Sequence, residues 1–249
     1  MEEPTYFLAL DVFRDHGLQV LGIPIDGEGL CPDALEDALN RHTPALLYTI
    51  PSFQNPTGTT MSAARREALI AIGRAHDLLI VADEVYHLLD FGNAPPRPLA
   101  SYAHDARVLS FGSFSKICAP RLRLGWIESS PALLHTLVHS GLVQSGGGLN
   151  PFTSGVVRSL LELGLADTTL DALRAVYAER SAVLCRALRE QVPTATFIEP
   201  RGGYFVWVEL PDDMRAAALR LSFAHYDAPT LVEGVERLAR AMEGYGRAV

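Results

Sequence analysis

The chain has 249 residues, of which 48% are hydrophobic and 20% charged, and its formal net charge at pH 7 is −8. This composition indicates a globular protein, and an acidic chain with scattered arginines argues against nucleic acid or an anionic membrane surface as its partner. The three cysteines lie far apart without a paired motif, and the N-terminus is acidic where a signal peptide is basic, so we expect a cytoplasmic protein.

The first half of the chain alternates helical periodicity with short apolar runs. We expect helices over residues 5–15, 32–41 and 63–76, and strands over residues 19–26, 45–50, 78–86 and 107–112. Asp33 and Ser62 are the expected N-caps of the second and third helices. Strands that are apolar throughout and separated by helices are typical of a parallel sheet covered on both faces. The sequence therefore predicts an α/β fold with a mainly parallel sheet and flanking helices.

The second half of the chain shows longer helical patterns and then alternating strands. We expect helices over residues 131–141, 151–164 and 167–192, with Gly146–Gly148 as a flexible connection, and strands over 194–200, 202–210 and 219–223 before a helix over 229–242. Antiparallel strands beside helices predict a smaller α+β C-terminal domain. We therefore divide the chain into a large domain, residues 1–165, and a small domain, residues 166–249.

Lys116 is the single lysine of the chain, beside 20 arginines, and it lies among small residues in an expected loop between two strands. Because arginine keeps its proton in proteins, this lysine is the side-chain amine that can act as a nucleophile. Asn55 lies just beyond an expected strand end and Asp83 lies at one, and the carboxyl ends of parallel strands meet at one edge of a sheet. We therefore expect Asn55, Asp83 and Lys116 to converge, with a solvated surface lysine as the alternative interpretation.

The residue types around Lys116 suit one cofactor. An amine forms an imine with an aldehyde, a carboxylate such as Asp83 holds a proton on a ring nitrogen, and Tyr86 and Asn55 offer bonds to a ring oxygen. Hydroxyl and guanidinium groups that suit a phosphate occur at Ser113, Ser115 and Arg123. An aldehyde, a ring nitrogen, a ring oxygen and a phosphate together describe pyridoxal 5'-phosphate.

Four short motifs occur in a fixed order: NPTG at 55–58, ADEVY at 82–86, SFSK at 113–116 and RLGW at 123–126. In order and spacing they resemble the fold-type I, class I/II aminotransferases, which depend on pyridoxal 5'-phosphate. The segment YTIPSFQNPTG is similar to the subgroup that includes 2-aminoadipate and broad-specificity aromatic aminotransferases. The resemblance extends from Pro4 to Met242 and implies a PLP-transferase-like large domain.

The resemblance implies a role for each matching residue around the cofactor. Lys116 would bond to the cofactor aldehyde and later move the proton from the substrate Cα, while Asp83 would pair with the pyridinium nitrogen. Asn55 and Tyr86 would bond the ring oxygen. The phosphate would be held by Ser113, Ser115 and Arg123.

Two further residues match family positions at the ring and the substrate. Tyr6 matches the aromatic residue that stacks on the ring, although a core tyrosine on a helix face is the alternative. Arg220 matches the arginine that clamps the substrate α-carboxylate, although a surface arginine on a strand is the alternative. Asn55 is expected to lie beside the substrate as well as the cofactor.

The implied reaction transfers an amino group between an L-amino acid and a 2-oxo acid, and the implied assembly is a homodimer. The loop PSFQ, residues 51–54, favours a large substrate side chain such as 2-aminoadipate or an aromatic group. One alternative is a lyase of the same fold, because the motifs do not separate the two reactions. The other is a shortened cofactor binder with little or no activity, because segments of the family pattern are missing. We expect no metal site, since the histidines lack ligand spacing.

The sequence departs from the family pattern in two places. Family members carry on the order of a hundred residues before the EPTY segment, which approaches a small domain in length. The family also has a helix, a strand and a loop where this chain has only residues 212–218 between Pro211 and Leu219. We therefore expect an exposed sheet edge or apolar face. The shortened small domain also raises the question of whether Arg220 is aimed at the substrate.

Overall fold

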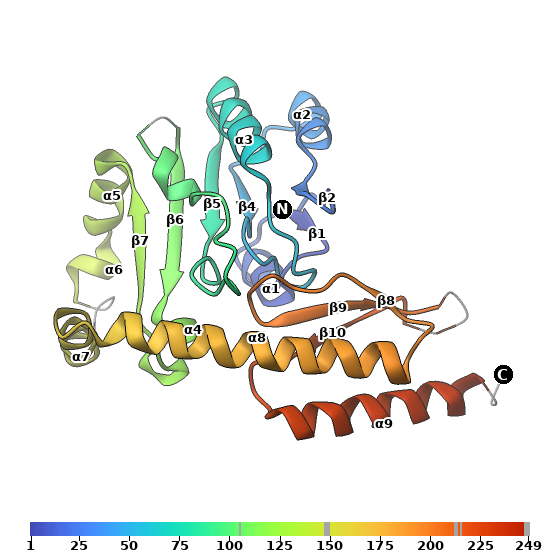
Figure 1. The fold of residues 1–249 in the computed structure, drawn as a ribbon. Helices are drawn as coiled ribbons and strands as arrows, with labels where there is room; N and C mark the ends of the chain where they lie inside the picture. The colour runs from blue at the N-terminus through green and yellow to red at the C-terminus, as the bar shows by residue number, and fades with distance from the viewer. Residues whose placement is uncertain (105, 147–149, 212–213, 215, 247–249) are drawn as a thin grey trace.

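The computed structural model describes residues 1–104, 106–146, 150–211, 214 and 216–246 (Figure 1). Its centre is a four-stranded sheet in the order β4-β5-β6-β7, formed by Leu46–Thr49, Leu79–Asp83, Val108–Ser113 and Gly125–Ser129. Strands β4, β5 and β6 are parallel, and β7 runs antiparallel to β6. The expected mainly parallel sheet is confirmed.

Two apolar clusters cover the sheet. One contains residues of α2 (Pro32–Arg41) and α3 (Ala63–Ala75) packed with Ile80 and Val108 of the sheet. The other gathers residues of α8 (Leu165–Gln191), with Val81 and Phe111 packed against it. Since successive strand residues face opposite sides, β4, β5 and β6 are covered on both faces by these clusters, whereas β7 is largely exposed.

The two expected helix caps have different outcomes. The Ser62 side chain accepts a hydrogen bond from the Arg65 amide and caps α3, as expected. The N-cap of α2 is Cys31 rather than Asp33, and Pro32 is the first helical residue. Proline suits that position because its missing N–H needs no partner there, which moves the helix start ahead of the expected one.

The N-terminal segment forms α1 (Phe7–Asp15) and a small sheet of β1 (Glu2–Glu3), β2 (Ile23–Asp26) and β3 (Gly29–Leu30). The strand expected over 19–26 therefore begins only at Ile23. A groove of ≈ 380 Å³ runs beside β4, and its lining includes Met1, Leu21, Leu39 and Leu46. The expected exposed sheet edge or apolar face stays a prediction, since Leu47 and Tyr48 of β4 are buried in the lining of this groove.

The expectation that Lys116 lies in a loop is wrong. Lys116 lies in the single-turn helix α4 (Phe114–Ile117), directly after β6. The Ser113 side chain accepts a hydrogen bond from the Ser115 amide and so closes the turn. Polar serine at an N-cap begins a helix even when no apolar periodicity marks it, which is why the pattern indicated a loop. Short helices follow α4: η2 (Pro120–Leu122), α5 (Pro131–Val138) and α6 (Gly141–Gln144), with η1 (Leu99–Tyr102) preceding β6.

The C-terminal part consists of α8, the antiparallel strands β8 (Thr196–Phe197), β9 (Phe205–Glu209) and β10 (Ala218–Ser222), and α9 (Ala228–Gly246). Helix α8 lies across the carboxyl ends of β4, β5 and β6 (Figure 1). The expected α+β unit is therefore present. The division after residue 165 falls just after the first residue of α8, beyond the end of α7 (Pro151–Glu162), and it stays a prediction. Of the expected Gly146–Gly148 connection, Gly147 and Gly148 lie outside the described residues.

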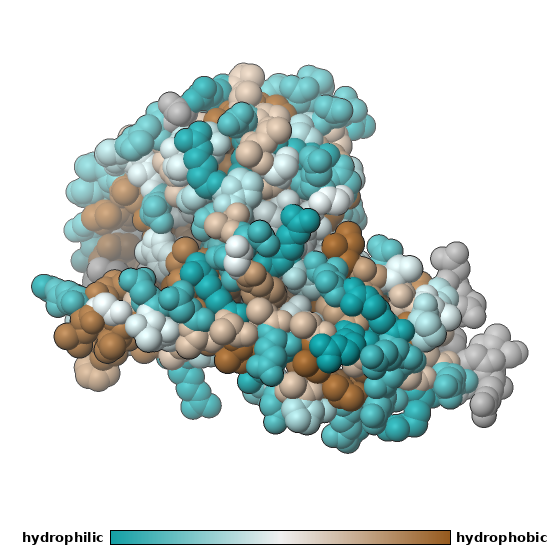
Figure 2. All heavy atoms as spheres, in the orientation of Figure 1, coloured by the Kyte–Doolittle hydropathy of each residue, from teal (hydrophilic) through white to brown (hydrophobic). Residues whose placement is uncertain are grey.

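Apolar side chains are exposed at the end of the molecule where α7 meets α8. Phe152 is 81% exposed and Leu163 is 71% exposed. Figure 2 shows the apolar residues over α7 and the start of α8 at the lower left. Among the helices of the described residues, none combines the length and apolar composition needed to cross a membrane.

A buried arginine fixes the loop between β4 and α3. Arg66 is 0% exposed and donates to the carbonyls of Met61 and Pro51 and to the Ser52 hydroxyl. Its Nη1 also lies 3.6 Å from Oε1 of Glu84. A charge this deep is tolerated because each donor has a partner. Arg66 therefore holds the loop that contains Asn55.

Replacing Arg66 by methionine should lower the free energy of unfolding by about 3–5 kcal/mol, because Glu84 and the two carbonyls lose their buried donor. Urea denaturation of the two proteins measures this difference. The matched control is Arg158→Met, whose side chain is 78% exposed in an ion pair on α7, and which should change stability by about 0.5 kcal/mol or less. Equal losses for the two variants would contradict the structural role of Arg66.

Candidate active site

The register of the parallel strands brings three segments to one edge. Thr49 pairs with Ala82 and Ala82 with Ser110, so β4, β5 and β6 end at nearly the same level. Asp83 is the last residue of β5, Lys116 follows β6, and Asn55 follows β4 in the next loop. The charges of Asp83 and Lys116 influence one another, and Asn55 influences the hydroxyl of Tyr86. The expected convergence is therefore present.

Asp83 is a carboxylate in an apolar surrounding. It is 7% exposed, its Oδ2 accepts a 2.6 Å bond from the Tyr48 hydroxyl, and its Oδ1 accepts a 3.4 Å bond from the Val85 amide. Burial raises the pKa of Asp83 to about 6, although these two bonds and the charge of Lys116 oppose the rise. An ionised Asp83 would therefore pair strongly with a cationic group bound beside it.

The Lys116 amine lies over two aromatic rings. Its Nζ is 5.9 Å from the ring centroid of Tyr86 and 5.6 Å from that of Tyr204. Burial lowers the pKa of Lys116, the charges of Arg123 and Arg220 lower it further, and Asp83 opposes them. A lysine with a lowered pKa is neutral in a larger fraction of molecules, and the neutral form is the nucleophile and the base.

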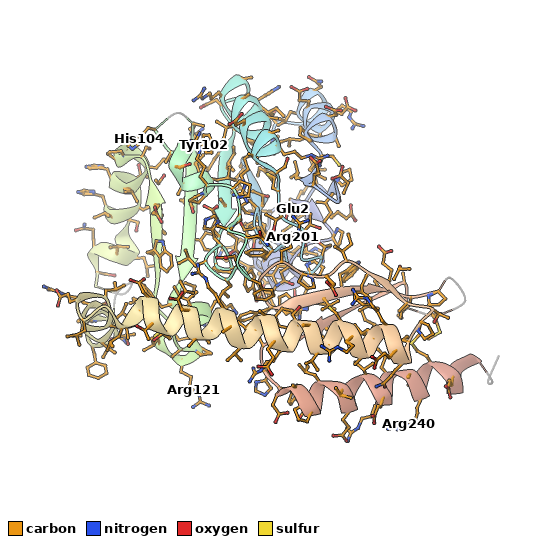
Figure 3. The ribbon with its side chains drawn as sticks, in the orientation of Figure 1. Glu2, Tyr102, His104, Arg121, Arg201 and Arg240 are labelled. Carbon is orange, nitrogen blue, oxygen red and sulfur yellow. The ribbon has the colours of Figure 1, made fainter. Side chains whose placement is uncertain are left out.

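Hydroxyl and guanidinium groups are gathered at the start of α4. Nη1 of Arg123 donates to Oγ of Ser115 over 3.2 Å, and Oγ of Ser113 accepts from the Ser115 amide. Arg123 has a φ of 50°, a left-handed conformation that turns the chain after η2. By contrast, Arg121 points away from the body of the molecule (Figure 3). Of these two neighbours, the structure brings Arg123 to Ser115.

Arg220 lies beside Asn55 although 165 residues separate them in sequence. Its Nη1 donates to Oδ1 of Asn55 over 2.7 Å, and its guanidinium carbon is 4.4 Å from the ring centroid of Phe205. Asn55 itself is 2% exposed. The guanidinium is thus held in place by one hydrogen bond and one aromatic face. The shortened chain before β10 does not prevent Arg220 from reaching the site.

Tyr86 and Tyr6 complete the set of residues expected from the sequence. Tyr86 is 5% exposed, and burial and the charge of Asp83 raise the pKa of its hydroxyl, while Arg220 and Asn55 oppose the rise. Tyr6 is half-buried at the start of α1 and packs against the apolar cluster that contains Tyr86. Both aromatic side chains therefore belong to the same cluster.

Tyr204 lies in the site although it was not among the residues expected from the sequence. Its hydroxyl donates to the Lys116 carbonyl over 2.7 Å, and its ring centroid is 5.3 Å from that of Tyr86. The preceding glycines make this possible, because a Cβ at Gly202 would collide with the Phe53 ring and Gly203 has a φ of +75°. Two glycines before an aromatic residue are a visible signal of such a close approach.

The raised pKa of Asp83 predicts a pH-dependent stability of the cofactor-free protein. The folded state binds this proton more tightly than the unfolded state, whose ordinary value is 3.8. The contribution of Asp83 to the free energy of unfolding is therefore fully present below about pH 4. About 3 kcal/mol of that free energy is lost as the pH rises to about 6 and above. In the Asp83→Asn variant this loss should be absent, so its stability advantage should grow between pH 4 and pH 7. Urea unfolding at both values tests this, and a constant difference would contradict it.

The chain is similar to known aminotransferases along nearly its whole length. The protein-family model described as "Aminotransferase class I and II" matches residues 1–238 of this chain. A 2-aminoadipate transaminase of Thermus thermophilus is 34% identical over 98% of this chain and 69% of the relative. An aromatic-amino-acid aminotransferase of Thermococcus litoralis is 30% identical over 98% of this chain and 66% of the relative. The chain thus spans about two thirds of the length of these curated relatives.

Solved structures show the same similarity in three dimensions. The crystal structure of the α-aminoadipate aminotransferase from Thermus thermophilus, complexed with N-(5'-phosphopyridoxyl)-L-leucine, has a TM-score of 0.91 and 33% identity. The match covers 100% of this chain and 71% of that one. The chain therefore belongs to the class I and II aminotransferases, a family of enzymes that depend on pyridoxal 5'-phosphate.

Proposed function

We propose that this chain transfers an amino group between an L-amino acid with a large side chain and a 2-oxo acid. The observation that carries the proposal is the convergence of Lys116, Asp83 and Arg220 at one sheet edge. Amine, buried carboxylate and guanidinium are the three groups that amino transfer to and from a carboxylate substrate requires.

The donor set of the site fits pyridoxal 5'-phosphate. Ser113, Ser115 and Arg123 would hold the phosphate, Asp83 would pair with the ring nitrogen, and the ring oxygen would bond to Asn55 and Tyr86. Asp83, Asn55 and Tyr86 are buried, and Asp83 has no cationic hydrogen-bond partner among the described residues. A bound cation at that position would offset the burial of its charge.

Lys116 has the central role in this proposal. When bound, the cofactor supplies an aldehyde for covalent attachment and a protonated ring that accepts electrons. The neutral Lys116 amine removes the proton from the substrate Cα, and its burial and the nearby arginines favour that neutral form. Because the amine belongs to the same short helix as Ser115, its position relative to a bound phosphate is fixed.

Two observations support a substrate with a large side chain: the surroundings of Arg220 and the names of the relatives. The guanidinium carbon of Arg220 is 4.4 Å from the ring centroid of Phe205 and 5.5 Å from that of Phe7. The Phe7 side chain is 53% exposed. Phe53 of the PSFQ loop is 2% exposed and lies against Gly202, and the expectation that this loop leaves room for a large side chain stays a prediction. Relatives named for 2-aminoadipate and aromatic amino acids support the same size class.

The homodimer and the cytoplasmic location expected from the sequence stay predictions. Light scattering of the protein with bound cofactor measures the first directly. A mass of one chain at micromolar concentration would contradict the expected dimer.

Adding pyridoxal 5'-phosphate should produce a visible absorbance band, and borohydride should fix the cofactor on Lys116. The design is simple because the chain has one lysine, so the other primary amine is the N-terminus of Met1. Lys116→Arg should lose the fixed label and reduce amino transfer by about a thousandfold or more. Peptide mass spectrometry locates the label. A label on Met1 alone would contradict the assignment, and release of ammonia without a new amino acid would indicate a lyase.

Arg220→Lys should raise KM for the amino acid by about 10- to 100-fold with a smaller effect on kcat, because an ammonium lacks the planar fork that binds a carboxylate through two hydrogen bonds. Steady-state kinetics at fixed 2-oxo acid measures both values. Arg121→Lys, an exposed arginine that points away from the molecule (Figure 3), is the control and should leave KM unchanged. Equal KM values for both variants and the parent chain would contradict carboxylate binding by Arg220.

A further inference from the structure

Tyr48 is a buried polar residue for which the proposed reaction has no direct use. It lies on β4, is 4% exposed, and its ring packs edge-on against Phe13 with the centroids 5.6 Å apart. Its hydroxyl makes one hydrogen bond, a 2.6 Å bond to Oδ2 of Asp83 on the neighbouring strand. This length is typical of a hydroxyl that donates to an ionised carboxylate.

The parallel register explains why the two groups meet. Tyr48 pairs with Val81 and Thr49 with Ala82, so the Tyr48 side chain starts two positions before Asp83 and reaches it along the strand. The Val85 amide approaches the other carboxylate oxygen. Two donors from different segments thus fix the orientation of the Asp83 carboxylate.

We propose that Tyr48 is a positioning residue of this active site, whose hydroxyl orients the Asp83 carboxylate and keeps it ionised in an apolar surrounding. The consequence for catalysis rests on the proposed pairing of Asp83 with the cofactor ring nitrogen. The coupling between Tyr48 and Asp83 itself belongs to the cofactor-free chain and is testable there.

The other charged and titratable groups around this pair act differently. Lys116, on α4, favours the ionised form of Asp83, whereas Glu84, next in sequence, opposes it. Tyr86 and Glu2 act electrostatically on Tyr48 without a hydrogen bond to it. Among these groups, Tyr48 is the side chain that donates a hydrogen bond to Asp83. Removing its hydroxyl should therefore change the titration of Asp83 without removing a charge.

The test follows the Asp83 carboxyl carbon by ¹³C NMR in the cofactor-free chain as the pH is changed, with the signal assigned by its loss in Asp83→Asn. In the parent chain the midpoint should lie near pH 6. In Tyr48→Phe, which keeps the ring packing, the midpoint should rise by about one pH unit or more. The control is Tyr102→Phe, which removes another buried hydroxyl, one bonded to Arg97 instead, and should leave the midpoint unchanged. An unchanged midpoint in a folded Tyr48→Phe protein would overturn the proposal.

A second measurement needs no variant and decides the matter if Tyr48→Phe does not fold. The Cζ carbon of Tyr48 in ¹³C-tyrosine-labelled parent protein should shift with the same midpoint as Asp83, because its hydroxyl loses an ionised acceptor there. A flat Tyr48 signal across the Asp83 midpoint would overturn the coupling. Failure of the proposed function is separate, since it would appear as absent cofactor uptake by the parent chain while both titrations remain coupled.

Discussion

The site depends on the burial of one carboxylate at the end of β5. Asp83 lies where β4, β5 and β6 end together, in a cluster that excludes water, and its pKa rises to about 6 as a result. Such a group remains ionised near neutral pH because donors surround it, and here Tyr48 and Val85 are those donors. The charge of Asp83 also opposes the lowering of the Lys116 pKa by burial. The buried Asp83 carboxylate therefore influences the protonation of Lys116 as well as its own.

Most of the fold and most of the site could be predicted from the sequence. Apolar strands separated by helices determine a parallel sheet, and a parallel sheet brings the residues that follow its strands to one edge. This is why Asn55, Asp83 and Lys116 were found together from their positions alone. The prediction that these residues converge depends only on the existence and direction of the strands. An error of several residues in strand length, such as the late start of β2 at Ile23, does not change it.

Contacts made by single side chains across long distances could not be predicted in this way. Tyr48 belongs to a strand that looks wholly apolar, and nothing local shows that its hydroxyl bonds Asp83, 35 residues later. The Tyr204 hydroxyl reaches the Lys116 carbonyl across 88 residues. Such partners are determined by tertiary packing, since a buried hydroxyl must find an acceptor wherever the fold places one. The single-turn helix of Lys116 was missed for a related reason, because a serine cap rather than an apolar pattern begins it.

The C-terminal strands are attached to the site by contacts that do not need the longer small domain of the family. The Gly203 amide donates to the Leu89 carbonyl, Tyr204 bonds the segment of Lys116, and Arg220 bonds Asn55. Each contact joins β9, β10 or the loop before them to a segment that follows β4, β5 or β6. Strand β10 is paired with β9 from Ala218 to Ser222, so the direction of the Arg220 side chain is set by that register. In this chain, which has only residues 212–218 between Pro211 and Leu219, the register of β9 and β10 places the Arg220 guanidinium beside Asn55.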